Sequence, residues 1–374
     1  MENQDYYEKL AKKLDSTITG LSKLGTKDNI SDTWMEYLRT LVPSDLVEFM
    51  IKLPIFPGVM TVRKFAKKIE KSESEAQSIL NRLFENDCVM RMGSKSYKYG
   101  IHIPLLIFDV PPVGYKKMPE EKAKMLAELS LKYLIDEEWY RNFEGSPETP
   151  LTRIIPVQES VSFESNIRPF EDIEKLLDEA KIISLQDCAC RARLEFLGKR
   201  KCNYPIETCL GLNQGARYFI DRGYGREISK KEAKELLRKL NKMGLVHTTE
   251  NFREGNHTLI CSCCPCCCSL ISGITRWDNP RAVAAANFVA FIENPEDCAQ
   301  CEICIDNCHF NAIIMGEVSP KIDSKKCMGC GVCVVNCPSE IIQLRKLERE
   351  EIYRDLIELG LKVAKETDKE IKLF

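Results

Sequence analysis

The sequence predicts an α+β protein built from three domains and a closing helix, and three observations support this. Apolar residues at helical spacing and a hairpin pattern occupy the first 110 residues. Ten cysteines lie between Cys188 and Cys268, around a capped helical segment. Eight more, in two copies of one spacing, lie between Cys298 and Cys337. We therefore expect a helical N-terminal domain at 1–110, a central cysteine-rich α+β domain at 111–280, a compact C-terminal domain at 281–345 and a helix at 346–374.

Length and composition exclude several classes of protein. The 374 residues are enough for two or three domains, each with its own core. The 54 basic and 56 acidic side chains nearly balance, so no global field favours nucleic acid or an anionic membrane. No apolar run approaches the roughly 18 residues of a spanning helix, and the first residues lack the apolar core of a secretory signal. We expect a cytoplasmic protein with no membrane span.

The cysteine count also indicates the redox compartment. An odd number, 19, in closely spaced groups of a long chain argues for metal thiolates in a reducing cytosol and against a disulfide framework. Cys88 stands apart from the groups and is predicted to be a small buried apolar residue.

The N-terminal region predicts helices followed by a small hairpin. Residues 1–52 carry helical stripes, and a short helix follows from Thr61 to Ile69. A capping box starts a helix from Ser72 to Glu85, and two short strands, Val89–Met92 and Tyr97–Tyr99, flank a turn. Helix, helix and hairpin in this order are typical of a winged-helix domain.

The charge of this region decides between two uses of such a domain. Residues 61–100 hold nine basic and five acidic side chains, and the second helix exposes Glu73, Glu75 and Glu85 beside Arg82. Phosphate contacts dominate affinity for DNA, so this helix face is poorly suited to a duplex. We therefore expect a docking or dimerisation module, with a homodimer through this domain as one form, in preference to DNA binding.

The next segments connect this domain to the first cysteine group. Residues 101–118, with prolines at 104, 111 and 112, are predicted to be a linker. Helices are expected from Pro119 to about Phe143 and from Phe170 to Ala180, separated by a loop at 145–156, and an apolar run follows at 182–185.

The central cysteine group has two parts separated by folded protein. The first part is Cys188, Cys190, Cys202 and Cys209, and the second is Cys261, Cys263, Cys264, Cys266, Cys267 and Cys268. Between them Ser229 and Glu232 cap an amphipathic helix that ends at Gly244, a scaffold expected to bring the two parts together. In extended chain the cysteines of the second part would alternate between two faces, with Pro265 bending both sets.

Thiols this crowded predict metal binding. Unbound, they would be an oxidation hazard, and iron–sulfur ligation is the favoured interpretation. Zinc remains an alternative because an all-sulfur site suits both metals. Spacing does not decide which of the ten ligate, so at least one further iron–sulfur cluster is expected on them. Arg191, adjacent to Cys190, is the candidate cation that stabilises an anionic cluster; the lysines at 199 and 201 fit a solvated basic loop equally well.

The C-terminal cysteines carry the most specific pattern of the chain. Each half reads C-x2-C-x2-C-x3-C, the spacing of a bacterial-type ferredoxin with two [4Fe–4S] clusters, in which the fourth cysteine of each run ligates the other cluster. Two structural zinc sites are the alternative, although zinc modules favour two separated pairs. One cluster would take Cys298, Cys301, Cys304 and Cys337, and the other Cys327, Cys330, Cys333 and Cys308. A proline usually follows the last cysteine of each run. Here a proline follows Cys337, whereas His309 follows Cys308.

Regular structure is expected on both sides of these runs. Residues 287–292 predict a strand that enters the ferredoxin fold, and residues 341–344 predict one that leaves it. A charged helix from about Lys346 to Thr367 then closes the chain.

These motifs in this order resemble one protein family. The chain carries C-x-C-R, C-N-Y-P-x-E-T-C-L, G-R-E-I-S-x-x-E-A, G-L-V-H and C-x-C-C-x-C-C-C before the dicluster pattern. In this it is similar, from about Leu53 to Leu344, to the winged-helix and 4Fe–4S dicluster proteins of anaerobic bacteria and archaea, ferredoxin-type iron–sulfur proteins. The resemblance implies redox work in an anaerobic cytoplasm and names no partner. Ala189 and Ala192 stand where such proteins carry aromatic and histidine side chains, so no role is carried over for those positions.

Three functions remain open on the sequence. The leading one is an electron-transfer protein that passes single electrons through two cubanes, between a redox partner protein and the site on residues 188–268. The second is an iron–sulfur oxidoreductase whose active site is that unusual centre. The third is a redox-sensing winged-helix transcription regulator, against which the acidic helix counts.

Overall fold

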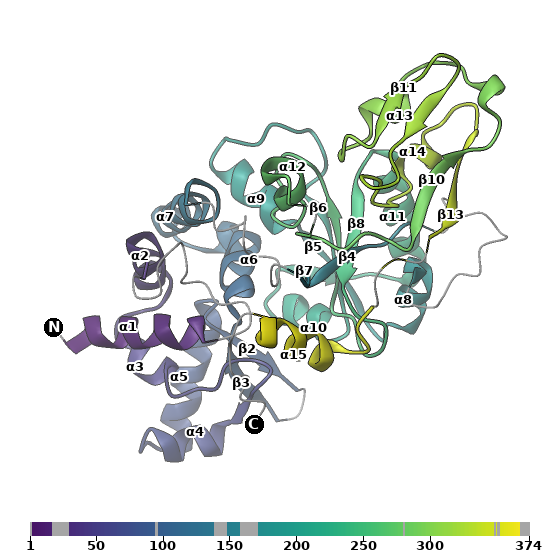
Figure 1. The fold of residues 1–374 in the computed structure, drawn as a ribbon. Helices are drawn as coiled ribbons and strands as arrows, with labels where there is room; N and C mark the ends of the chain where they lie inside the picture. The colour runs from purple at the N-terminus through teal and green to yellow at the C-terminus, as the bar shows by residue number, and fades with distance from the viewer. Residues whose placement is uncertain are drawn as a thin grey trace. The chain divides into compact units, whose positions relative to one another are not determined.

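A computed structural model describes residues 2–16, 30–93, 96–137, 148–157, 171–279, 281–347, 349 and 352–366. The chain divides into two compact units (Figure 1). The first unit comprises Met1–Phe143, Ala189–Arg200 and Val363–Phe374, and the second comprises Glu144–Cys188 and Lys201–Lys362. Both combine helices with antiparallel strands, so the α+β class is confirmed. The domain boundaries at 110, 280 and 345 stay predictions.

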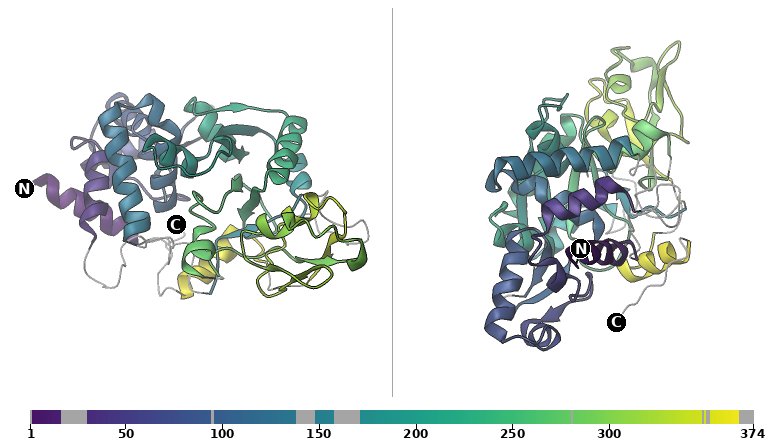
Figure 2. Two further views of the ribbon diagram at one scale, coloured as in Figure 1. Left: turned by 90° about the horizontal axis from the view of Figure 1, so that it is seen from above. Right: turned by 90° about the vertical axis from the view of Figure 1, so that its left-hand side faces the viewer.

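The first unit is mainly helical, with a small sheet. Its core contains an aromatic group in which the ring of Phe108 lies 5.1 Å from Trp34, 4.8 Å from Tyr37 and 5.5 Å from Tyr133. Figure 2 shows its helices beside one another in both views. Its elements are α1 (Glu2–Asp15), α2 (Asp32–Leu41), α3 (Val47–Met50), β1 (Met60–Thr61), α4 (Val62–Lys68), α5 (Glu73–Glu85), β2 (Val89–Met92), β3 (Lys98–Ile101), α6 (Pro104–Gly114), a 3-10 turn (Tyr115–Lys117), α7 (Glu120–Leu131), a π-helical turn (Lys132–Asp136) and α9 (Ala189–Phe196).

The two helices and the hairpin expected at 61–101 are present. The side chain of Ser72 accepts a hydrogen bond from the backbone N–H of Glu75, and the Glu75 carboxylate accepts from Ser72 N–H, which confirms the capping box of α5. Strand β3 pairs antiparallel with both β1 and β2. The assignment of this arrangement as a winged helix stays a prediction.

The linker predicted at 101–118 is wrong, because most of it is the buried helix α6. Pro104 occupies its first turn, where a missing N–H costs nothing. Pro111 and Pro112 lie inside the helix and cannot donate to the carbonyls of Ile107 and Phe108, four residues earlier.

Side chains from two other helices replace the missing donors of α6. The hydroxyl of Tyr37 donates to Ile107 O at 2.8 Å, and the guanidinium of Arg193 donates to Phe108 O at 2.6 Å. Arg193 also lies 3.4 Å from the Asp109 carboxylate. Burial, and then the charge of nearby Cys190, raise the pKa of Asp109 to about 7 although Arg193 acts in the opposite direction. The two prolines are therefore tolerated because tertiary contacts satisfy the carbonyls that they leave open.

The second unit is built on a six-stranded antiparallel sheet in the order β4-β8-β9-β6-β5-β7. Separate two-stranded ribbons, β10-β13 and β11-β12, accompany two short helices. Its elements are β4 (Thr152–Ile154), α8 (Ile173–Glu179), β5 (Ile183–Asp187), β6 (Glu207–Leu212), α10 (Gln214–Asp221), β7 (Gly225–Glu227), α11 (Lys230–Lys242), β8 (Val246–Glu250), β9 (Leu259–Cys263), α12 (Ser272–Trp277), β10 (Phe288–Ile292), a 3-10 turn (Pro295–Asp297), α13 (Ile303–Asp306), β11 (Ile313–Met315), β12 (Pro320–Ile322), α14 (Val332–Val335) and β13 (Ile342–Lys346).

The pairing of β9 determines which loops meet. Leu210 of β6 pairs with Ile260 of β9, and Val246 of β8 pairs with Cys263. Since both pairings are antiparallel, the end of β9 lies beside the beginnings of β6 and β8. The loops before β6, before β8 and after β9 therefore gather at one end of the sheet.

The last helix is shorter than predicted. Lys346 pairs with Phe288 as the end of β13, and α15 (Leu356–Glu366) begins ten residues later. The carboxylate of Asp355 accepts hydrogen bonds from the backbone N–H groups of Ile357 and Glu358, which starts the helix there. The predictions on 17–29, 94–95, 138–147, 158–170, 348, 350–351 and 367–374 lie outside the described residues. Within the described ranges we find no helix with the length and apolar character that crossing a bilayer requires.

We predict that Tyr37→Phe destabilises the first unit around α6. The change leaves Ile107 O buried without its hydroxyl donor, which costs about 1–3 kcal/mol. Hydrogen–deuterium exchange of the α6 amides should accelerate by roughly tenfold or more. Tyr6→Phe, which removes a hydroxyl from a half-buried tyrosine of α1, is the matched control and should leave these rates unchanged. Equal rates in both variants would contradict the role of Tyr37.

Candidate metal centres

The two C-terminal cysteine runs adopt the same backbone. In the first loop the left-handed residues are Gln300 and Glu302, which lie directly before and directly after Cys301. The second loop has Gly329 and Gly331 at the same two positions. A left-handed residue also follows each run three positions after its last cysteine, at Asn311 and Glu340. Two left-handed turns within seven residues bend each loop so that its first three cysteines face one space.

The eight cysteines of these runs divide between two cavities. One is lined by Cys298, Cys301, Cys304 and Cys337 together with apolar side chains that include Met315 and Ile342. The other is lined by Cys308, Cys327, Cys330 and Cys333, with Phe310 and Leu344 among its neighbours. Each cavity thus receives three cysteines from one run and the last cysteine of the other, the division that the spacing predicts. Ligation of a cluster by these residues stays a prediction.

Burial and mutual charge act on the thiols of both cavities. Burial, together with the charges of Cys337 and Cys301, raises the pKa of Cys304 to about 11. Burial, together with the charges of Cys327 and Cys308, likewise raises the pKa of Cys330 to about 12. The thiols of Cys304 and Cys330 therefore hold their protons until a cation displaces them.

Backbone N–H groups point at the sulfurs. Gln300 N–H lies 3.4 Å from Cys298 Sγ, Ala312 N–H lies 3.3 Å from Cys308 Sγ, and Ala290 N–H lies 3.5 Å from Cys327 Sγ. Such donors stabilise negative charge on thiolates and on any cluster that they hold. The donor set, its division into fours and these amides fit two [4Fe–4S] clusters.

Residues 297–349 match the family model of the 4Fe-4S dicluster domain. The chain therefore contains an iron–sulfur domain of ferredoxin type, and the matched residues include both loops. No match was found among curated proteins or among solved structures.

Two contacts of the dicluster domain were not foreseen. A Cβ on Gly329 would lie 2.4 Å from Phe288 O, so the second loop can approach strand β10 only with glycine there. Arg349 donates to Cys327 O at 2.6 Å and to Phe288 O at 3.3 Å, which places a cation beside the second cavity. The glycine at the middle of C-x-G-C was a signal in the sequence, whereas nothing near Arg349 in the sequence marked it.

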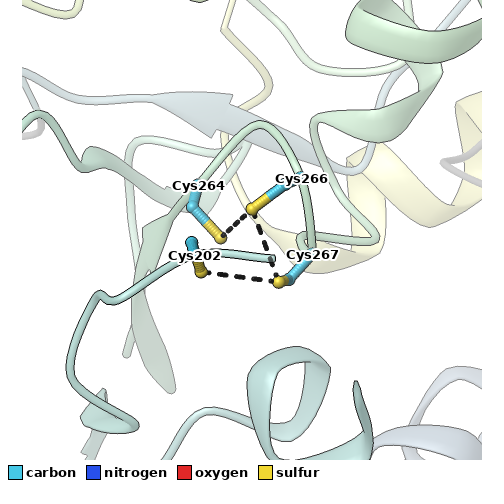
Figure 3. Close-up of side chains that lie close together, drawn as sticks. All are labelled: Cys202, Cys264, Cys266 and Cys267. Carbon is cyan, nitrogen blue, oxygen red and sulfur yellow. Dashed lines mark hydrogen bonds between the residues drawn. The ribbon is translucent and has the colours of Figure 1, made fainter. Parts of the chain in front are cut away.

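Four cysteines of the central group lie together at the end of the sheet where three loops gather. Cys202 precedes β6, and Cys264, Cys266 and Cys267 follow β9; Figure 3 shows their sulfurs facing one another. The Sγ–Sγ distances are 3.7 Å for Cys202–Cys267, 3.8 Å for Cys264–Cys266 and 3.5 Å for Cys266–Cys267. The group thus joins the two parts of the central cysteines.

This geometry corrects the expected alternation along 261–268. The extended strand ends at Cys263, and the following residues form a turn. Cys264, Cys266 and Cys267 consequently converge, although extended chain would have placed Cys267 on the face opposite the other two. Burial and the charge of Cys264 raise the pKa of Cys266 to about 12. A hydrogen bond that the Cys267 thiol donates to Cys264, and then burial, raise the pKa of Cys267.

The other central cysteines occupy different surroundings. Cys263 and Cys268 are buried in an apolar core that also includes side chains of the dicluster domain. Cys261 is partly buried and packs against this core. Cys209 lies in β6 beside Gln186, and buried Cys188 follows β5, with its N–H donating to Ile206 O at 2.7 Å. Cys190 and the fully buried Arg191 belong to α9 in the first unit. Metal ligation by these residues and the role of Arg191 stay predictions.

His309 connects the dicluster domain to the same end of the sheet. Its Nε2–H donates to Gly244 O at 2.6 Å, in the turn that leads into β8. Burial lowers the pKa of His309, opposed by this hydrogen bond and by the charge of Cys264. The imidazole next to Cys308 therefore lies near both the second cavity and the four-cysteine group, a contact that proline could not make.

We predict that Gly329→Ala empties the second cavity. The new methyl group would meet the β10 backbone, so the loop with Cys327, Cys330 and Cys333 must move. Anaerobic iron and sulfide analysis should show a loss of about four iron atoms per chain. Gly198→Ala is the control, because that glycine also has a positive φ but a Cβ there meets nothing within 4 Å. Full iron content in the Gly329 variant would contradict the prediction.

Proposed function

We propose that this protein transfers single electrons through two [4Fe–4S] clusters in its dicluster domain, to or from a further cysteine-ligated centre on residues 188–268. The division of eight cysteines into two crossed sets of four carries the proposal. Clusters bound in the two cavities supply one-electron transfer. Cys298, Cys301, Cys304 and Cys337 hold the first, and Cys308, Cys327, Cys330 and Cys333 hold the second.

Differences in exposure support a direction for the electron path. Cys301 is the exposed one among the 19 cysteines, all of which lie in described residues. Beside it the side chain of Ile303 is 37% exposed. The first cluster would thus meet a soluble one-electron partner protein at this edge. The second, through Cys308 and His309, faces the four-cysteine group.

The surrounding residues tune and insulate this path. Apolar side chains line both cavities, and the N–H groups of Gln300, Ala312 and Ala290 stabilise negative charge on sulfur. The Arg349 guanidinium adds positive charge beside Cys327, which favours the reduced form of a cluster there.

The contacts of α5 weigh against the regulator hypothesis. Arg82 is the one basic residue of that helix, and its guanidinium pairs with the Asp45 carboxylate at 2.6 Å. Glu73, Glu75 and Glu85 of α5 are all acidic, and the first two lie exposed at its beginning. The oxidoreductase alternative requires an open metal site on residues 188–268, and the contacts given for the described residues do not favour it over electron transfer.

We predict opposite effects of two double variants on iron content. Cys298→Ala with Cys337→Ala removes two ligands of one cluster, so about four iron atoms should be lost. Cys298→Ala with Cys308→Ala removes one ligand from each, so about eight should be lost. Anaerobic iron and sulfide counts, with EPR of the reduced protein, measure both.

The same pair of variants tests the crossed assignment. If each run held its own cluster, the first variant would lose both clusters and the second would lose one. Cys88→Ala, a buried cysteine of the first unit, is the control and should keep all the iron.

We also predict that the full-length protein binds duplex DNA weakly, because the phosphate backbone would meet the acidic beginning of α5. Fluorescence anisotropy with mixed-sequence duplexes at moderate salt should give dissociation constants no tighter than about 1 μM, as for non-specific binding. Nanomolar, sequence-selective binding would favour the regulator.

A further inference from the structure

The sulfurs of Cys202, Cys264, Cys266 and Cys267 are too close together for the corners of a cubane. All four lie within 4.8 Å of one another. A tetrahedron with metal–sulfur bonds of about 2.3 Å places its sulfurs about 3.8 Å apart. The three Sγ–Sγ distances of 3.5, 3.7 and 3.8 Å agree with that value. In a cubane each thiolate binds a different iron atom, so the sulfurs stand farther apart.

The dicluster cysteines give an internal comparison. In the described part of the chain, this is the one group of three or more histidine, cysteine or carboxylate ligand atoms that all lie within 4.8 Å of one another. The eight cysteines around the two cavities are therefore more widely spaced, as two cubanes require. The same protein thus contains two kinds of thiol site that differ in spacing.

The turn that carries three of these cysteines is held by its own contacts. The N–H of Cys268 donates to Cys264 O at 3.3 Å and closes the turn. From α12, the Arg276 guanidinium donates to Cys266 O at 2.8 Å and the Thr275 hydroxyl to Pro265 O at 3.4 Å. Helix α12 therefore presents the three thiols in a fixed arrangement, and Cys202 closes the fourth corner from the loop before β6.

Exposure provides a route for an ion. Cys264 and Cys267 are buried, whereas Cys202 and Cys266 are partly exposed. Four thiolates at these distances repel one another strongly unless they are protonated or share a cation. A thiolate donor set of this kind suits Zn²⁺ or iron and disfavours Mg²⁺ or Ca²⁺.

We propose that Cys202, Cys264, Cys266 and Cys267 bind one metal ion, zinc or iron, as a tetrahedral tetrathiolate. This site holds no inorganic sulfide and is separate from the two cubane cavities. The proposal names four ligands among the ten central cysteines and does not depend on electron transfer by the dicluster domain. With iron the centre can exchange one electron with the cluster beside His309; with zinc it is structural.

The test compares metal and sulfide contents of the full-length protein purified anaerobically. Cys202→Ala and Cys266→Ala should each lose about one zinc or iron atom per chain, with sulfide and the EPR of the cubanes unchanged. Which metal disappears identifies the natural ion. A loss of about four iron and four sulfide would mean a cluster and would overturn the proposal, as would no loss at all.

Cys263→Ala separates this site from its neighbours in sequence. Cys263 is adjacent to Cys264, but its sulfur lies 3.6 Å from the Thr248 hydroxyl and outside the group. This variant should retain the single ion. If it loses the ion as the other two variants do, the proposed ligand set is wrong.

A measurement on the unaltered protein guards against variants that fail to fold. In the native protein, alkylation followed by peptide mapping should leave Cys202 and Cys266 unmodified until a chelator removes the ion, even though both are partly exposed. Immediate alkylation of both thiols in the metal-loaded protein would overturn the proposal. The cubane counts are independent of this result, so failure here is distinguishable from failure of the electron-transfer function.

Discussion

The antiparallel pairing of β9 with β6 and with β8 is the constraint on which the four-cysteine group depends. It places the end of one strand beside the beginnings of two others, so residues more than 60 positions apart in sequence meet. Cys202 belongs to the loop before β6, and Gly244 lies in the loop before β8. The third loop supplies Cys264, Cys266 and Cys267. Without that register, the two parts of the central cysteine group would lie in separate places in the fold.

The same end of the sheet joins this group to the dicluster domain. Gly244 O accepts a hydrogen bond from His309 Nε2–H, and a Cβ on Gly244 would lie 3.1 Å from Asn307 Oδ1 and 3.3 Å from Tyr204 OH. Residues flanking Cys308 and Cys202 therefore crowd around one glycine. This contact places the second cavity close to the four-cysteine group.

Thiol spacing distinguishes two kinds of cysteine site in this unit. Left-handed residues at matched positions open the dicluster loops so that each cysteine faces a separate corner of a cavity. The turn after β9 instead brings three thiols to near van der Waals contact, and α12 holds it there. Backbone geometry, more than the number of cysteines, thus determines which chemistry each site suits.

The sequence by itself determined the dicluster domain, because C-x2-C-x2-C-x3-C is a local pattern that places several cysteines within one short loop. It also indicated the capping box of α5 and the strand at Asn287–Ile292, which are short-range features. Tertiary structure decided the rest. Residues 104–114 form a helix despite two prolines because Tyr37 and Arg193, distant in sequence, donate to the freed carbonyls. Cys264, Cys266 and Cys267 converge with Cys202 because strand pairing, which alternation along a single segment cannot reveal, brings their loops together.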